Sequence, residues 1–577
     1  MKRIEWCGIV GFLLAGCVAA SPGAAVRASA DGGGELRAVI DQVQSDRGAL
    51  GRFFDVEGST ARIARLRLNA EEARARLDGL DFAILDQDGK IDWILLRADL
   101  SGELADLALE EKRAAEDTTL VPFLPRIAAL LEARQRVEPL EPEAAANELD
   151  ALTKELETLR EGFEKEKPDV PRSRAVRAGE RTGELAHKLK RWYEFRAGYD
   201  PLFTWWVRVP HEALQKELTA HAKTLRETVA GLKEDDEETI IGDPVGREAL
   251  VADLARAMIA YTPEELLALA DQEFAWCEQE MKKAAAELGL GDDWKQALER
   301  AKQDHVGPGE QPELILELAR EAWDYVEREE LISVPPLAKE VWRMNMLSPE
   351  AQRTSPFFLG GESILVSYPT DGMTHEEKLM SMRGNNRHFC RATVHHEVVP
   401  GHHLQGFMTD RHFAYRWPFS TPFWTEGWAL WWEMLLYERG FVSAPLDRVG
   451  ALFWRMHRCA RIQFSLRFHL GELTPEQCID YLVDKVGHER ENAEAEVRRS
   501  FNGSYGPLYQ LAYMTGALQF RALYSELVRS GSMTPRAFHD GVMTSGNMPI
   551  EMVRARLANL PLPRDFTAAW KFYEPPR

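Results

Sequence analysis

Apolar residues recur at helical spacing along most of the chain between residues 35 and 335. In the stretches 61–80 and 148–163, alanine and leucine return every three or four positions, separated by glutamate, lysine and arginine. A period of about 3.6 residues places such apolar side chains on one face of an α-helix. The pattern therefore predicts a mainly α-helical protein.

Three threonines mark the starts of further helices. Thr262 precedes a proline and two glutamates at the head of a long amphipathic stretch, and Thr374 and Thr474 stand three residues before Glu377 and Gln477. A threonine hydroxyl at such a position accepts a hydrogen bond from the third helical N–H, and the acid or amide side chain returns one. We therefore predict a capping box at each threonine.

The alternation that is typical of β-strands is scarce in this chain. The best candidate is Ser363–Tyr368, which ends at Pro369 because proline has no N–H for a strand ladder. The sequence therefore predicts a small β-sheet within a mainly α fold. We divide the chain beyond its N-terminal segment into a helical N-terminal region, 35–335, and a second region, 336–577.

The N-terminal segment has the pattern of a signal peptide. A basic start, Met1-Lys2-Arg3, precedes an apolar stretch from about Cys7 to Ala20. About 14 apolar residues are too few to cross a membrane, which takes about 20, but they fit the hydrophobic part of a signal peptide. The pattern predicts an exported protein.

The sequence Leu14-Ala15-Gly16-Cys17 resembles a bacterial lipobox, in which Cys17 is lipidated and becomes the mature N-terminus. Ordinary cleavage after Val18-Ala19-Ala20 is the alternative. We predict a signal peptide over 1–16 and a flexible tether over 17–34, which is rich in serine, glycine and alanine. The protein is then periplasmic, or it is held on a bacterial membrane by lipid alone.

Composition and charge narrow the function further. Of the 577 residues, 45% are hydrophobic and 28% are charged, which is ordinary for a globular protein. The 71 Lys and Arg residues against 92 Asp and Glu residues give a net charge of −21, which argues against nucleic acid or an anionic membrane surface as the main partner. The cysteines beyond residue 20 are too few and too scattered for a disulfide framework.

Four of the 15 histidines fall within residues 395–403, around Glu397. Clustered imidazoles beside a carboxylate suit zinc and its activated water. Downstream, Glu426 and Glu433 lie seven residues apart in an aromatic-rich segment, and a turn of about 100° per residue places both on one helix face. Carboxylates on the inner face of such a helix are costly unless they are paired or bind a metal.

The spacing of the histidines departs from the HExxH pattern, because Pro400 stands four residues after His396. In an unbroken helix His396 aligns with His403, about 700° further on, whereas His402 points about 120° away. Pro400 removes a backbone donor and Gly401 weakens the helix, so a local bulge can bring His402 round. His402 and His403 therefore both stay candidates.

At these residues the sequence resembles a known family. The segment His396-Glu397-x-x-Pro-Gly-His402-His403, followed by Glu426-Gly-Trp-Ala-Leu-x-x-Glu433, is similar to the bacterial DUF885 family, which is grouped with the gluzincin-type metallopeptidases. The specific motifs occupy about 390–435 and a weaker patch near 505–521. The resemblance implies a large multi-helix metallopeptidase-like body, with the small sheet beside the active-site helix and with 336–577 as the catalytic region.

The resemblance also implies a ligand set and a base. In such enzymes the second histidine and the glutamate ligand lie about 24 residues apart, as do His402 and Glu426 here. This favours one Zn2+ per chain held by His396, His402 and Glu426, with Glu397 as the general base and His403 as a substitute ligand. Three protein ligands leave one zinc position for water, whose pKa falls toward ~7 on the metal.

Further roles are expected around this set. Glu433 is expected to accept an N–H from a ligand histidine and to fix its tautomer, with a surface or structural acid as the alternative. If His403 is not a ligand, we expect it to contact a ligand residue without binding the metal itself. His395 flanks the motif and is a candidate for a hydrogen bond to substrate.

The patch Pro507–Arg521 is similar to the C-terminal pattern of the family, although Tyr509 stands where glutamine is expected. Tyr513 is the candidate donor to the developing oxyanion. Arg521 is the candidate for binding a peptide carboxylate or an internal acid. Both side chains are equally compatible with a structural role.

Together these features predict zinc-dependent hydrolysis of peptide bonds in short peptides, with metal-bound water as the nucleophile and Glu397 as the base. A metal-dependent amidase or esterase acting on a non-peptide substrate is one alternative. A catalytically inactive helical scaffold lipoprotein is another, although a structural metal site has no need of Glu397.

Overall fold

The computed structural model describes residues 32–575, except 234–235, 237–238, 353–354, 356, 359 and 504. Cys17, the predicted signal peptide and most of the tether lie outside the described residues. Within the described part the fold is mainly α with one small two-stranded sheet, so the predicted fold class is confirmed. No helix in this part is long and apolar enough to cross a membrane.

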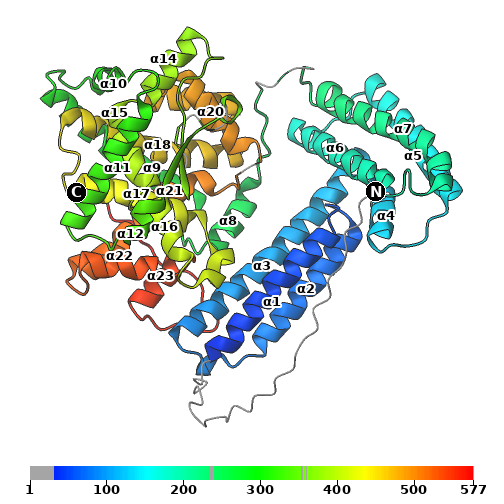
Figure 1. The fold of residues 1–577 in the computed structure, drawn as a ribbon, viewed down its shortest axis with the longest axis horizontal. Helices are drawn as coiled ribbons and strands as arrows, with labels where there is room; N and C mark the ends of the chain where they lie inside the picture. The colour runs from blue at the N-terminus through cyan, green and yellow to red at the C-terminus, as the bar shows by residue number, and fades with distance from the viewer. Residues whose placement is uncertain are drawn as a thin grey trace, which may run out of the picture.

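Two small helical bundles stand beside a larger body (Figure 1). The first bundle contains α1 (Gly32–Phe53), α2 (Thr60–Asp78) and α3 (Gln87–Glu116). The second contains α4 (Leu124–Gln135), α5 (Pro142–Lys165), α6 (Arg172–Glu194) and α7 (Pro201–Thr224). The predicted helical stretch 148–163 lies in α5, and the stretch 61–80 lies in α2 except for its last two residues; the apolar faces of both helices are buried.

The larger body holds the sheet and the other helices (Figure 1). These helices are α8 (Gly246–Arg256), α9 (Pro263–Glu287), α10 (Trp294–Lys302), α11 (Gln311–Arg328), α12 (Pro336–Val341), α13 (Pro349–Gln352), α14 (His375–Gly384), α15 (Arg387–Glu397), α16 (His402–Thr409), α17 (Pro422–Glu438), α18 (Pro445–His469), α19 (Pro475–Tyr481), α20 (Arg490–Phe501), α21 (Tyr509–Tyr524), α22 (Pro535–Met543) and α23 (Ile550–Leu557). Because α9 packs on α18 and α11 packs on α15, the cores on the two sides of the boundary drawn at residue 335 are continuous.

The three predicted capping boxes are present. The hydroxyl groups of Thr262, Thr374 and Thr474 each accept a hydrogen bond from the backbone N–H three residues on, and the side chain of that residue accepts one from the threonine N–H. They begin α9, α14 and α19. Local sequence therefore determines where these helices start.

Helix α7 has an aromatic pair, Trp205 and Trp206, of a kind that is usually buried in a core. Here Trp205 is 72% exposed and Trp206 is only half-buried. Helix α7 turns Phe203 and Val207 toward α5 and α6, and both are fully buried. Since those two residues define the inner face of the helix, Trp205 lies on its outer side.

The small sheet consists of β1 (Arg343–Met346) and β2 (Ser363–Val366), which run parallel. The predicted strand Ser363–Tyr368 thus ends two residues early. Parallel strands need a crossover connection, and α13 lies within it. Leu365 of β2 lines the cavity described below.

Two glycines let α17 and α21 cross in direct contact. A Cβ atom on Gly427 would lie 2.5 Å from Cα of Gly516, and a Cβ atom on Gly516 would lie 2.2 Å from the carbonyl oxygen of Phe423. No larger residue fits at this crossing without displacing backbone. The contact places Glu426 of α17 close to Tyr509 of α21.

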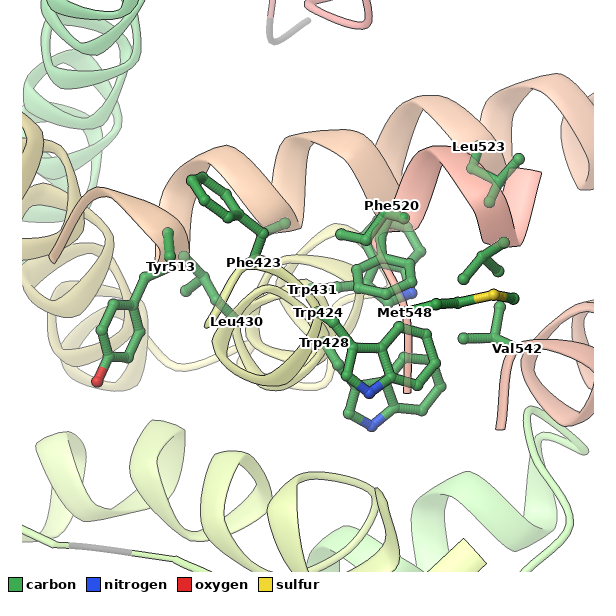
Figure 2. Packing of buried hydrophobic residues seen from close by; sticks show 14 of the residues in the cluster. Phe423, Trp424, Trp428, Leu430, Trp431, Tyr513, Phe520, Leu523, Val542 and Met548 are labelled. Carbon is green, nitrogen blue, oxygen red and sulfur yellow. The ribbon is translucent and has the colours of Figure 1, made fainter. Parts of the chain in front are cut away.

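The indole rings of α17 fill the space around this crossing. Figure 2 shows Trp424, Trp428 and Trp431 grouped with Phe520 of α21. The ring of Trp428 lies 5.6 Å from that of Phe520, and its Nε1 donates a hydrogen bond to the carbonyl of Pro400 at 2.8 Å. The aromatic core is therefore tied directly to the segment between α15 and α16.

The crossing predicts a stability effect. In Gly516→Ala the new methyl group meets backbone, so we expect the free energy of unfolding to fall by about 1–3 kcal/mol or more. Gly406→Ala is the control, because a Cβ atom there meets nothing within 4 Å, and alanine in a helix is favoured over glycine by about 0.5–1 kcal/mol. Urea unfolding measures both, and equal midpoints for the two variants would contradict the account.

Candidate metal centre

The chain between α15 and α16 breaks sharply over 398–401. The predicted bulge is in fact a full interruption, after which the N–H of Leu404 donates to the carbonyl of Val398 at 3.2 Å. A Cβ atom on Gly401 would lie 1.7 Å from the carbonyl oxygen of His396, so only glycine can pass this point. The break starts α16 at His402 and frees that side chain from the phase of α15.

This break brings together His396, His402 and Glu426. Their ligand atoms all lie within 4.8 Å of one another. Oε2 of Glu426 lies 3.2 Å from Nε2 of His402 and 3.6 Å from Nε2 of His396. Bonds of about 2.0–2.1 Å to one tetrahedral ion give ligand separations of ~3.3 Å, so these atoms have the spacing of metal ligands.

Unpartnered oxygen atoms support the same conclusion. Oε2 of Glu426 and Oε2 of Glu397 make no hydrogen bond to any described residue, although the two side chains are 5% and 6% exposed. Buried carboxylate oxygens without a partner are costly, and a cation between the imidazoles and Glu426 satisfies one of them. Two imidazoles and a carboxylate suit a divalent transition-metal ion. In the described ranges no fourth side chain joins the three.

Two neighbours orient these ligands. Nδ1 of His396 donates to Oε1 of Glu433 at 2.6 Å, which leaves Nε2 facing Glu426. The hydroxyl of Tyr509 donates to Oε1 of Glu426, which leaves Oε2 for an ion. Glu433 lies where the sequence analysis expected it, whereas Tyr509 had appeared only as a departure from the family pattern. Such partners fix the direction of a ligand atom.

Burial and charge shift the pKa values in this group. Burial disfavours the charged form of His396, but the carboxylates of Glu426 and Glu433 outweigh burial and raise the pKa to about 9. Burial acts to raise the pKa of Glu426, but His402 and His396 hold it well below its usual range. The pKa of Glu397 is raised, because burial exceeds the effect of the two histidines. The position between the ligand atoms therefore attracts positive charge. A metal ion and a proton compete for this position.

The three ligands lie in the wall of a cavity of about 510 Å³, a size common for small-ligand sites. Gly360 closes over one side, since a Cβ atom there would lie 2.1 Å from Oε2 of Glu397. Another part of the wall is aromatic and cationic. Its members from α18, α20 and α21 are Trp454, Arg458, Arg461, Arg499, Tyr509 and Tyr513.

Tyr513 faces this cavity, as expected. Its ring is stacked near that of His396, with centroids 6.1 Å apart, and its hydroxyl donates no hydrogen bond to the residues that the structure describes. Burial, followed by the charge of Glu426, raises the pKa of the phenol. The hydroxyl therefore keeps its proton and can donate it in a hydrogen bond.

His403 and His395 do not line the cavity. Nε2 of His403 lies 2.7 Å from the carbonyl oxygen of Ala338 in α12, so His403 faces away from the other imidazoles. His395 packs against Phe441 with ring centroids 6.0 Å apart, and burial lowers its pKa to about 4. The structure thus places His402 with the ligands and leaves His403 as a packing residue of α16, and it separates His395 from the cavity.

Arg521 also lies outside the cavity lining. Its Nε is 3.1 Å from Glu438, and its Nη1 donates to the carbonyl of Glu574. Of the two roles considered for this arginine, the structure shows the pairing with an internal acid. The arginines that line the cavity beside the centre are instead Arg458, Arg461 and Arg499. Arg458 and Arg461, with Trp454, recur every three or four residues on α18, a helical spacing that was present in the sequence but not noticed.

Metal analysis separates the two adjacent histidines. We expect purified His402→Ala to lose its bound divalent metal, because one of only three ligands is removed, and His403→Ala to keep it. Plasma mass spectrometry after dialysis against trace metal measures the metal content of each variant. The result shows which of the two histidines is a ligand. Retention by His402→Ala together with loss from His403→Ala would contradict the ligand set.

Comparisons with known proteins place the chain in context. It matches no curated protein. It is similar to a solved structure described as "a putative lipoprotein of unknown function" from Shewanella oneidensis, with 16% identity over 91% of this chain and 99% of that one and a TM-score of 0.67. It is also similar to "the putative lipoprotein from Colwellia psychrerythraea", with 16% identity over 91% and 98% of the two chains and a TM-score of 0.59. At this identity the likeness concerns the fold alone.

The sequence also matches the pattern of a protein family. The pattern of the family described as "Bacterial protein of unknown function (DUF885)" matches residues 50–557, which include α2 to α7 of the two small bundles and the candidate metal centre. The match covers most of the chain. The protein therefore belongs to the DUF885 family.

Proposed function

We propose that this protein is a zinc-dependent peptidase that hydrolyses short peptides outside the cytoplasm. The observation that carries the proposal is the position of Glu397. Its free Oε2 lies 4.0 Å from Nε2 of His402, inside the cavity and beside the three ligand atoms. A metal site that serves only stability does not require such a free carboxylate.

His396, His402 and Glu426 would hold the ion, with Glu433 and Tyr509 keeping their ligand atoms in place. When bound, zinc supplies Lewis acidity to a carbonyl oxygen and makes water a nucleophile near neutral pH. Only three protein ligands meet at the centre among the described residues, whereas closed structural zinc sites usually have four. This open position supports a catalytic centre.

Glu397 would act as the general base. It takes a proton from the attacking water and then delivers that proton to the amine that leaves. The hydroxyl of Tyr513 would donate a hydrogen bond to the oxyanion that develops on the scissile carbonyl. Tyr513 suits this task because its ring is held near His396 and because its hydroxyl is otherwise unused by the described residues.

The size of the cavity supports short peptides as substrates. A space of about 510 Å³, bounded by buried helices, admits a few residues of an extended chain but no folded domain. The aromatic rings of Trp454, Phe357 and Phe358 in its wall supply apolar contacts for side chains. An amide bond that reaches the centre would lie between these rings and the ligands.

We also propose that the chain is attached to a bacterial membrane through lipid on Cys17. The lipobox-like sequence Leu14-Ala15-Gly16-Cys17 supports this anchor. The two solved structures of similar fold are themselves described as putative lipoproteins. A lipidated N-terminus would hold the catalytic body outside the cytoplasm.

A single substitution tests the chemistry. In Glu397→Gln we expect hydrolysis of a mixed library of short peptides to fall by about 10²–10⁴-fold, because a general base contributes that much, while the zinc content is unchanged. Glu438→Gln is the control, since Glu438 lies on α17 and pairs with Arg521 away from the cavity. Unchanged turnover in Glu397→Gln would overturn the assignment of the base, and mass spectrometry of the library measures it.

A further inference from the structure

Three buried guanidinium groups line the cavity that holds the candidate metal centre. Arg458 and Arg461 come from α18 and Arg499 comes from α20, and the three residues are 5%, 3% and 5% exposed. Arginine is rarely buried unless its charge is paired. The hydrogen-bond and ion-pair partners of these three groups therefore indicate whether other residues of the protein satisfy all three charges.

Two carboxylates serve the three arginines. Nε of Arg461 donates to Glu496 at 2.7 Å, and Nη1 of Arg499 lies 3.7 Å from the other oxygen of the same acid. Arg458 reaches Glu433 only at 3.5 Å, and Glu433 already accepts the shorter hydrogen bond from His396. Three guanidinium groups of this wall therefore share two carboxylates as ion-pair partners.

Arg458 is the group with the largest unused capacity. Its Nε and Nη1 have no hydrogen-bond partner in the part of the chain that the structure describes, and the same holds for Nε of Arg499. Burial lowers the pKa of Arg458, Glu433 opposes this effect, and the charge of Arg461 adds to it. Unpaired buried N–H groups of a cation are costly, so the wall is suited to an anion that arrives with the substrate.

The guanidinium group of Arg458 is held in a fixed orientation. Its carbon lies 4.8 Å from the ring centroid of Trp454 and 5.2 Å from that of Tyr513. Contacts with two aromatic faces favour a planar cation and restrict its rotation. A planar cation with free N–H groups can donate charge-assisted hydrogen bonds to the oxygens of a carboxylate.

We propose that Arg458 and Arg499 bind a carboxylate of the peptide substrate, and that this carboxylate is the free C-terminus. The proposal rests on the peptidase function proposed above and names its substrate class. His396 and Arg458 lie at 6.1 Å and 5.2 Å from the centroid of the same Tyr513 ring. At most about three extended residues, of about 3.3–3.6 Å each, cover that span. Cleavage would then remove a small number of residues from the C-terminal end.

Binding to a protein that does not turn over tests the inference directly. The probes are trialanine with a free carboxylate and trialanine amide, titrated calorimetrically into zinc-loaded Glu397→Gln protein. We expect the free acid to bind about 10–100-fold more tightly than the amide, because a charged hydrogen-bonded pair is lost in the amide. Equal affinities, or binding of neither peptide, would overturn the proposal.

Substitutions of the arginines test whether Arg458 and Arg499 cause the preference for the free acid. Introducing Arg458→Gln or Arg499→Gln into the same protein should remove most of the preference for the free acid. Arg458→Lys should keep part of it, because the charge stays but the planar fork is lost. Arg448→Gln is the matched control, since Arg448 lies on α18 and pairs with Glu287 outside the cavity. Zinc content is measured in each variant, because Arg458 touches Glu433.

A side-chain carboxylate is the competing source of the same chemistry. Acetyl-Ala-Asp-Ala amide, compared with its Asn counterpart, presents a carboxylate that is not a C-terminus. A preference for the Asp peptide that matches the preference for free trialanine would overturn the assignment to the C-terminus. A free-acid preference in a protein that cleaves no peptide would instead count against the proposed peptidase function and leave the carboxylate site standing.

Discussion

The candidate centre depends on a steric fact at one residue. Gly401 passes so close to the carbonyl of His396 that any side chain would collide with it. This passage ends α15 at Glu397 and lets a new helix begin at His402. In a continuous helix His402 would point about 120° away from His396, and the two imidazoles would never share an ion. The hydrogen bond from Trp428 to the carbonyl of Pro400 ties the interrupted segment to α17, which contributes the third ligand.

The charges around this centre hold one another in place. Glu433 and Tyr509 each occupy one atom of a ligand residue and leave its other atom facing the shared position. Behind them, Arg461 and Glu496 form a buried pair. A buried charged network of this kind is expensive to maintain. Its presence around one cavity supports the proposed binding and chemistry.

Much of the fold was predictable because it depends on local sequence. Helical periodicity and the capping boxes at Thr262, Thr374 and Thr474 specify elements with their own neighbours, and the structure confirms them. The exposure of Trp205 was not predictable in this way, because it depends on which face of α7 packs against α5 and α6.

In the candidate site, too, some residues could be predicted from local sequence and others depend on tertiary packing. His396, His402 and Glu426 were found through a dense motif, and the structure brings them together. Arg458, Arg461, Arg499 and Tyr509 were missed, because the helical spacing on α18 marks only one face of a helix, and tertiary packing decides that α18, α20 and α21 meet at one cavity. Arg521 looked suitable in the sequence, yet the crossing of α17 and α21 pairs it with Glu438.

The most direct test of the central claim is anomalous diffraction at the zinc edge from crystals grown with zinc. We expect one strong peak with bonds of about 2.0–2.2 Å to Nε2 of His396, Nε2 of His402 and Oε2 of Glu426. A peak bound through His403, or no peak between these three side chains, would contradict this expectation.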